Sequence, residues 1–169
     1  MNYAELAQGT FANMLGTLDR LAAAAEDAGL PDSVLEARLA EDMFPLELQF
    51  RVAMNQVLLA LGQVGNTPVA LEAKTYASFA EIRARIAVIA ATIAESDPAQ
   101  WAPAEATVDL TLPNGVRFVM SSAEDIRDWI LPNFYFHVTM AYALLRREGV
   151  PLGKLDFVAH MARHRVEPD

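Results

Sequence analysis

His137 is the side chain in this sequence whose type and position best suit chemistry. It falls within a helical apolar stripe formed by residues spaced three and four apart: Ile130, Phe134, Ala141, Leu144 and Leu145. Asn133 lies one turn before it on the same side. Bundle helices often hold metals with polar groups at this spacing, and an imidazole can also act as a general base near neutral pH. A third interpretation, a hydrogen-bonded core histidine, is favoured, because a lone imidazole inside a bundle is more often a core residue than a ligand. The general-base interpretation is weaker, since no serine or carboxylate near it in the sequence completes a catalytic pair.

A second set of candidate ligands lies near the end of the chain. Asp156, His160 and His164 are four residues apart, so on a continuous helix they would line one face, as metal-binding pairs do. The alternative is a solvated terminal segment. We favour that alternative, because a metal site needs supporting groups around its ligands.

The composition excludes several other chemistries. The sequence has no cysteine, which rules out disulfides, zinc-thiolate sites and cysteine nucleophiles. A net charge of −9 argues against nucleic acids and anionic membranes as partners. The first residues carry no basic cluster with a following apolar run, and no apolar run approaches the ~20 residues of a membrane span. We therefore expect a cytoplasmic protein whose partner is a small molecule or a second copy of itself.

Four long helices are expected to position these side chains. The clearest begins at a Ser78–Glu81 capping box and buries residues that alternate in steps of three and four: Phe79, Ile82, Ile86, Ile89 and Ile93. The others are expected at about 3–28, 45–64 and 132–148, the last preceded by a short helix capped by Ser121 or Ser122. Asp42 is expected to cap the second helix, rather than to serve as a pocket carboxylate.

Between the third and fourth helices the hydrophobic period changes to two. Val108, Leu110 and Leu112 alternate with polar residues, and Val116, Phe118 and Met120 follow after Pro113-Asn114-Gly115. A three-residue turn pairs Leu112 with Val116 and keeps all six apolar residues on one face, whereas a two-residue turn mixes the faces. The sequence thus predicts an all-α fold, a four-helix bundle with one small β-hairpin at about 107–120. One domain is expected over 1–169, with a tail at 152–169 and a long connection at about 65–77.

The fourth helix also carries a family resemblance. Leu131-Pro-Asn-Phe-Tyr-Phe-His137, followed by Thr139, Tyr142 and Leu144-Leu-Arg146, resembles the last bundle helix of the DinB/YfiT-like superfamily, and most closely a bacterial family of unknown function within it. Residues 37–45, Gln49 and residues 153–157 match as well. The resemblance implies a DinB-like bundle, often a homodimer, with a three-histidine site for a metal such as Zn or Ni. Some members transfer small thiols or act on thiol-linked substrates.

Matched residue by residue, the family's metal site is only partly present. His137 corresponds to the second histidine of the last helix and Asn133 to the first, while Gln49 is the polar residue nearest to the histidine of the second helix. Amides are poor ligands for zinc or nickel. We therefore expect Gln49, Asn133 and His137 to form a degenerate site, a polar cluster in a small-molecule-binding or interaction protein. The alternative is a metal-dependent or histidine-based enzyme acting on a small substrate.

Overall fold

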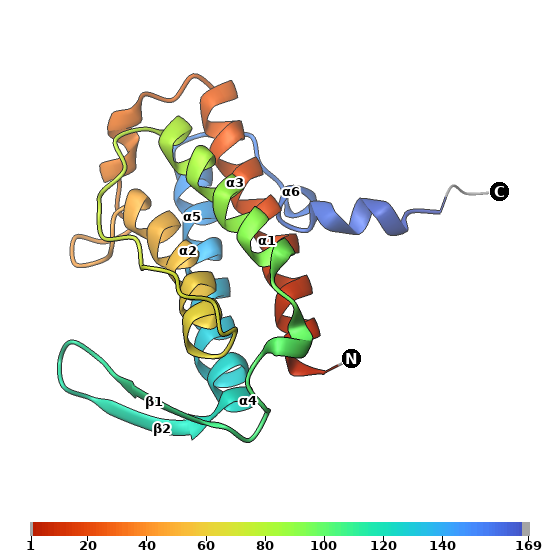
Figure 1. Ribbon diagram of the computed structural model, residues 1–169. Helices are drawn as coiled ribbons and strands as arrows, with labels where there is room; N and C mark the ends of the chain where they lie inside the picture. The colour runs from red at the N-terminus through yellow and green to blue at the C-terminus, as the bar shows by residue number, and fades with distance from the viewer. Residues whose placement is uncertain (1, 167–169) are drawn as a thin grey trace.

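Four long helices form a bundle in the computed structural model, which describes residues 2–166 (Figure 1). They are α1 (Tyr3–Asp27), α2 (Leu46–Gln63), α3 (Phe79–Glu95) and α5 (Leu131–Arg147). Helix α1 packs mainly against α3, and α2 mainly against α5. Helices α1 and α5 run in one direction and α2 and α3 in the other, so the connection at 64–78 crosses the length of the bundle. The predicted all-α bundle with one hairpin is confirmed.

Shorter elements connect and extend the bundle. Three segments are 3-10 helices (Asp32–Glu36, Pro98–Gln100 and Ala159–His164), two are short α-helices (α4, Ser122–Glu124, and α6, Lys154–Phe157), and Asp125–Ile130 is π-helical. The strands are β1 (Thr107–Thr111) and β2 (Arg117–Ser121). Among residues 2–166, no helix combines the length and the apolar character that crossing a membrane requires.

The core is built from the predicted helical stripes. The α3 residues spaced three and four apart, from Phe79 to Ile93, are all buried. Phe11 of α1 meets Phe134 of α5 edge to face, with ring centroids 5.3 Å apart, and Phe50 of α2 meets Phe79 of α3 in the same way. Edge-to-face pairs of this kind stabilise a fold beyond the area that they bury. The aromatic contacts therefore link α1 to α5 and α2 to α3, and so complement the main packing of α1 on α3 and of α2 on α5.

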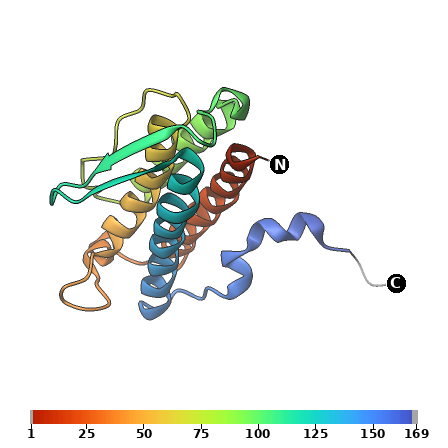
Figure 2. The same ribbon diagram turned by 90° about the horizontal axis from the view of Figure 1, so that it is seen from below.

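The hairpin has the predicted register. Val108 pairs with Met120 and Leu110 with Phe118, and the backbone N–H of Leu112 donates to the carbonyl of Val116. Gly115 has a φ of 86°, as the end of a three-residue turn requires. The hairpin extends across one end of the bundle, as seen from below in Figure 2.

A continuous helical stretch leads into α5, and it widens into a π-helical turn just before Pro132. Ser121, one of the two serines predicted as caps, caps the first part of this stretch, α4, in a reciprocal capping box with Glu124. The π-helical turn then follows, in which the N–H of Leu131 donates to the carbonyl of Ile126, five residues back. Pro132 has no N–H to donate, and the wider turn leaves room for its ring. The chain therefore stays helical from Ser122 to Arg147.

Two helix caps differ from the sequence prediction. Asp42 is exposed in a turn, and Pro45 is the residue at the N-cap of α2, without a side-chain bond, so the predicted Asp42 cap is wrong. Glu81 accepts the N–H of Ala77 rather than that of Ser78, although Ser78 does accept the N–H of Glu81. In both places the loop before the helix follows a path that the local sequence does not determine.

Gly65, just past the end of α2, lies in close contact with the backbone of the last turn of that helix, and this contact can be tested. A Cβ there would lie 2.9 Å from the Cα and O atoms of Leu61, whereas a Cβ at Gly62 would have no atom within 4 Å. We expect Gly65→Ala to lower the free energy of unfolding by about 1–2 kcal/mol, because backbone must move. Gly62→Ala should raise it by about 0.5–1 kcal/mol through helix propensity. Urea unfolding measures both, and equal effects would contradict the assigned close contact.

Candidate functional site

His137 lies inside the bundle, on the side of α5 that faces α2. The residue is 7% exposed, and Gln49 on α2 is 1% exposed. The Nδ1 atom of His137 lies 2.8 Å from Oε1 of Gln49, although the two residues are 88 positions apart in the sequence. The antiparallel packing of α2 and α5 therefore brings together two of the three polar residues singled out in the sequence.

The hydrogen bonds of Gln49 define the tautomer of this imidazole. Its Nε2 donates to the carbonyl of Phe44 at 3.0 Å, so Oε1 is the atom that faces the ring. An amide oxygen only accepts, which assigns the proton of His137 to Nδ1. The Nε2 atom then carries a lone pair, and no described residue donates a hydrogen bond to it.

Two aromatic rings surround the imidazole near the protein surface. Phe44 stacks at a centroid distance of 6.2 Å and an interplanar angle of 12°, and Phe136 contacts it edge-on at 5.2 Å. Both phenylalanines are about half exposed, at 49% and 52%. The imidazole therefore lies directly beneath an exposed aromatic patch, which consists of Phe44 and Phe136.

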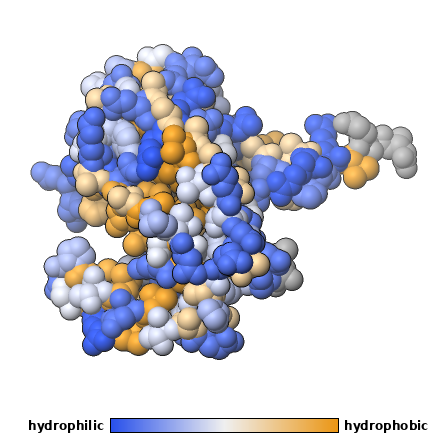
Figure 3. Space-filling model, in the orientation of Figure 1, coloured by the Kyte–Doolittle hydropathy of each residue, from blue (hydrophilic) through white to orange (hydrophobic). Residues whose placement is uncertain are grey.

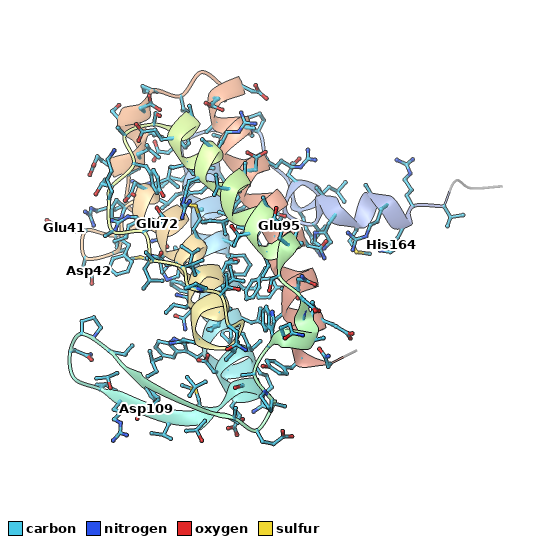
Figure 4. The ribbon with its side chains drawn as sticks, in the orientation of Figure 1. Glu41, Asp42, Glu72, Glu95, Asp109 and His164 are labelled. Atoms are coloured by element: carbon cyan, nitrogen blue, oxygen red, sulfur yellow. The ribbon has the colours of Figure 1, made fainter. Side chains whose placement is uncertain are left out.

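The loop that carries Phe44 is held at its base. The N–H of Leu46 donates to the carbonyl of Ala37 at 2.9 Å, and Arg147 of α5 donates to the carbonyl of Arg38. Glu41 and Asp42 lie at the outer turn of this loop, away from the bundle (Figure 4). The loop thus presents its phenylalanine to the imidazole and its carboxylates to solvent.

Burial controls the charge of His137. It lowers the pKa from the ordinary value of 6.5 to about 4, since a charged ring is poorly solvated there. The imidazole is therefore neutral at pH 7. The resulting contribution to stability is present above pH 6.5 and is lost as the pH falls towards 4.

Asn133 does not join this pair. Its Nδ2 donates to the carbonyl of Trp129 in the preceding turn at 2.7 Å, and the residue is only half-buried. The Oε1 atom of Gln49 already accepts from His137. Among these three residues, the Nε2 atom of His137 is therefore the one good donor atom for zinc or nickel. Within residues 2–166, no group of three or more His, Asp or Glu side chains is placed to hold an ion. The residues present do not fit the family's metal.

The tail does not align its candidate ligands. Helix α6 ends at Phe157, and His160 and His164 belong to a 3-10 segment, in which residues four apart do not share a face. Asp156 accepts the N–H of Gly153, and Nε2 of His164 pairs with Nε of Arg163. The single helical face considered for these three residues is therefore not formed.

A separate polar network fixes the crossing connection between α2 and α3. Glu47, 3% exposed, accepts from Arg51 at 2.9 Å and from the N–H of Tyr76 at 3.1 Å. Glu72 bonds Tyr76 and Arg85, and Figure 4 shows it beside α2. Each of the two carboxylates is thus bonded to an arginine and to Tyr76. We therefore interpret the network as a support of the connection between α2 and α3 and not as a reactive centre.

Asp125 is a buried acid that follows directly after the short helix α4. It is 0% exposed, and neither carboxyl oxygen has a hydrogen-bond partner among the described residues. Burial raises its pKa from 3.8 to about 6. Its charge adds to the effect of burial in raising the pKa of Tyr3. The only sequence signal for this inward position is Pro132, seven residues later, because a proline disturbs the regular spacing of the residues that share one face of a helix.

Comparisons with known proteins identify the family and the fold. A family described as a domain of unknown function (DUF1993) matches residues 3–158. A crystal structure of a DinB family member protein from Shewanella denitrificans is 27% identical in sequence, with a TM-score of 0.75, and the match covers 100% of this chain and 98% of that one. No curated protein matches.

Proposed function

The chain belongs to the DUF1993 family, a domain of unknown function, and on this premise we propose that it binds a small polar molecule at His137. The family match and the DinB-family neighbour confirm the resemblance drawn from the fourth helix. The observation that carries the proposal is the neutral imidazole, which is oriented by Gln49 and keeps a free lone pair on Nε2.

The surroundings of Nε2 support a particular class of ligand. A lone pair at the edge of a mostly apolar surface is an acceptor that favours a neutral N–H or O–H donor. Phe44 and Phe136 offer exposed ring surface beside it. We therefore propose a small ligand with one hydrogen-bond donor attached to a planar or apolar body.

An acid–base enzyme is the competing function. The hydrogen bond from Nδ1–H to a fixed oxygen orients the ring as in enzymes whose histidine is a general base. However, a pKa of about 4 makes the imidazole a weak base at neutral pH, because efficient bases have a pKa near the working pH. Binding therefore fits the electrostatics better than proton transfer does.

Nitrogen-15 NMR of the ring tests the proposal, because the sequence contains only three histidines. We expect the His137 signals to show a neutral Nδ1–H tautomer from pH 8 down to about pH 5, as its lowered pKa of about 4 requires. A panel of neutral phenols, lactams and azoles serves as the probe. At least one should shift the Nε2 signal of His137 with saturable binding.

Two variants complete this test. His137→Phe keeps an aromatic ring but removes the acceptor, so the shifts of neighbouring amides on adding the probe should vanish. His164→Phe alters an exposed residue of the C-terminal tail and should bind as the natural protein does. Binding that persists in His137→Phe, or a charged His137 ring at pH 7, would contradict the proposal.

The assembly and location of the protein form part of the same proposal. We propose that residues 1–169 constitute one domain, that the protein acts in the cytoplasm and that it forms a homodimer. Support for the dimer comes from the exposure of apolar side chains outside the site, such as Leu155 at 83% and Leu6 at 52%.

A further inference from the structure

The last described residues form an arm that leaves the bundle. The C-terminal arm, residues 152–166, starts beside α1 and continues away from the other helices in both Figure 1 and Figure 2. The arm is tied to α1 at two points, since Thr17 donates to the carbonyl of Phe157 at 2.9 Å and Arg163 donates to Asn13 at 2.9 Å. The ring of Phe157 also contacts Tyr142 edge to face. The arm therefore has a defined direction.

The arm carries apolar side chains that its own bundle does not cover. Leu155 is 83% exposed, Met161 53% and Val166 87%. Figure 3 shows apolar and hydrophilic residues side by side on the arm. Between the arm and α1 lies an open groove of about 540 Å³, lined mainly by Leu155, Val158, Ala159, Met161 and Ala162, with Arg20 from α1. An apolar surface of this kind is typical of a contact with another molecule.

The charge distribution identifies the partner that suits this surface. Residues 1–153 contain ten Lys and Arg against nineteen Asp and Glu, so they carry the whole net charge of −9, whereas residues 154–169 are balanced. Within the arm, residues 160–165 contain two arginines and two histidines and no acid. The basic stretch is complementary to an acidic bundle, and such complementarity selects a partner and accelerates its association.

We propose that the C-terminal arm packs against the bundle of a second copy of this chain, and that two arms are exchanged in a two-fold symmetric dimer. The arm's apolar residues supply the buried contact, and its basic stretch meets the acidic surface of the other copy. An anionic membrane is a less suitable partner, because the −9 bundle would approach it together with the arm. This inference rests on the homodimer proposed above and names its surface.

Sedimentation velocity of the full chain over a range of micromolar concentrations tests whether the arm forms the dimer contact. The natural protein should be a dimer. The double variant Leu155→Asp with Met161→Asp should raise the dimer dissociation constant at least about tenfold, as the loss of central apolar contacts does. Val166→Asp, near the arm's end, provides a second variant that disturbs no packed residue. Val88→Asp is the matched control, since Val88 is 51% exposed on α3 and away from the arm.

The outcomes separate the proposals from one another. If both arm variants still form dimers, the proposed role of the arm is wrong and the homodimer proposal is retained. If the natural protein is a monomer at every concentration, both proposals are wrong. Co-sedimentation of the natural protein, but not the double variant, with phosphatidylserine vesicles would assign the arm to a membrane instead. The NMR signals of His137 should be the same in all these variants, so failure at the ligand site is recognised independently.

Discussion

Replacing Asp125 with asparagine should raise the free energy of unfolding by about 3 kcal/mol at pH 8 and by only about 0.5 kcal/mol at pH 4. The carboxyl is 0% exposed without hydrogen-bond partners, and its pKa rises from 3.8 to about 6 on folding. The folded state thus binds the proton more tightly than the unfolded chain. Stability is then fully present below pH 3.8, falls as the pH rises to about 6 and is constant above that. Asparagine stays neutral and removes this dependence.

Urea unfolding of both proteins between pH 4 and pH 8 measures the effect. Asp128→Asn is the matched control, because Asp128 lies three residues later on the same helix, is exposed and pairs with Arg127. The pairing lowers the pKa of Asp128, so its replacement should bring no gain at pH 8. A difference between Asp125→Asn and the natural protein that does not change with pH would show that Asp125 is partnered in solution.

The second large effect is expected from Gln49→Met. The substitution keeps the side-chain volume but leaves the buried Nδ1–H of His137 without an acceptor, and it removes the bond to the carbonyl of Phe44. An unsatisfied buried donor costs about 1–3 kcal/mol, so we expect the free energy of unfolding to fall by about 2 kcal/mol at pH 7. Chemical denaturation measures it.

Two further variants make that result specific. Gln56→Met lies two turns along the same helix, and the Oε1 of Gln56 is buried without a partner, so its replacement should be neutral or stabilising. Combining Gln49→Met with His137→Leu removes donor and acceptor together. The double variant should therefore lose less than the sum of its single changes. Strict additivity would exclude a coupling between Gln49 and His137.

The regular elements of the fold were predictable from the sequence because local rules determine them. Three apolar pairs could share one face of the hairpin only with a three-residue turn, and the strands have that register. The stripe from Phe79 to Ile93 has one helical period, and α3 buries all of it. The stripe around His137 likewise predicted an inward-facing ring, and the residue is 7% exposed. Where one face of an element must be buried, the pattern is sufficient.

Other features depend on contacts that no local pattern records. Asp125 faces inward because a π-helical turn changes the direction of the side chains that follow Ser121, and periodicity assumes a regular helix. Asn133 shares a helix face with His137, yet its amide bonds the preceding turn. Gln49 was identified through family resemblance, since its partner is 88 residues away. The course of the arm depends on its contacts with α1, which the sequence of the tail does not reveal.

The π-helical turn at Asp125–Ile130 also bears on how this chain tolerates changes in length. Such a turn contains one residue more than the α-helical turn it replaces, and the surplus is confined to a single place. The helix on either side keeps its neighbours, so an insertion there need not propagate through the core. We therefore expect descendants of this sequence to gain or lose single residues between Glu124 and Leu131 more readily than anywhere else along their long helices.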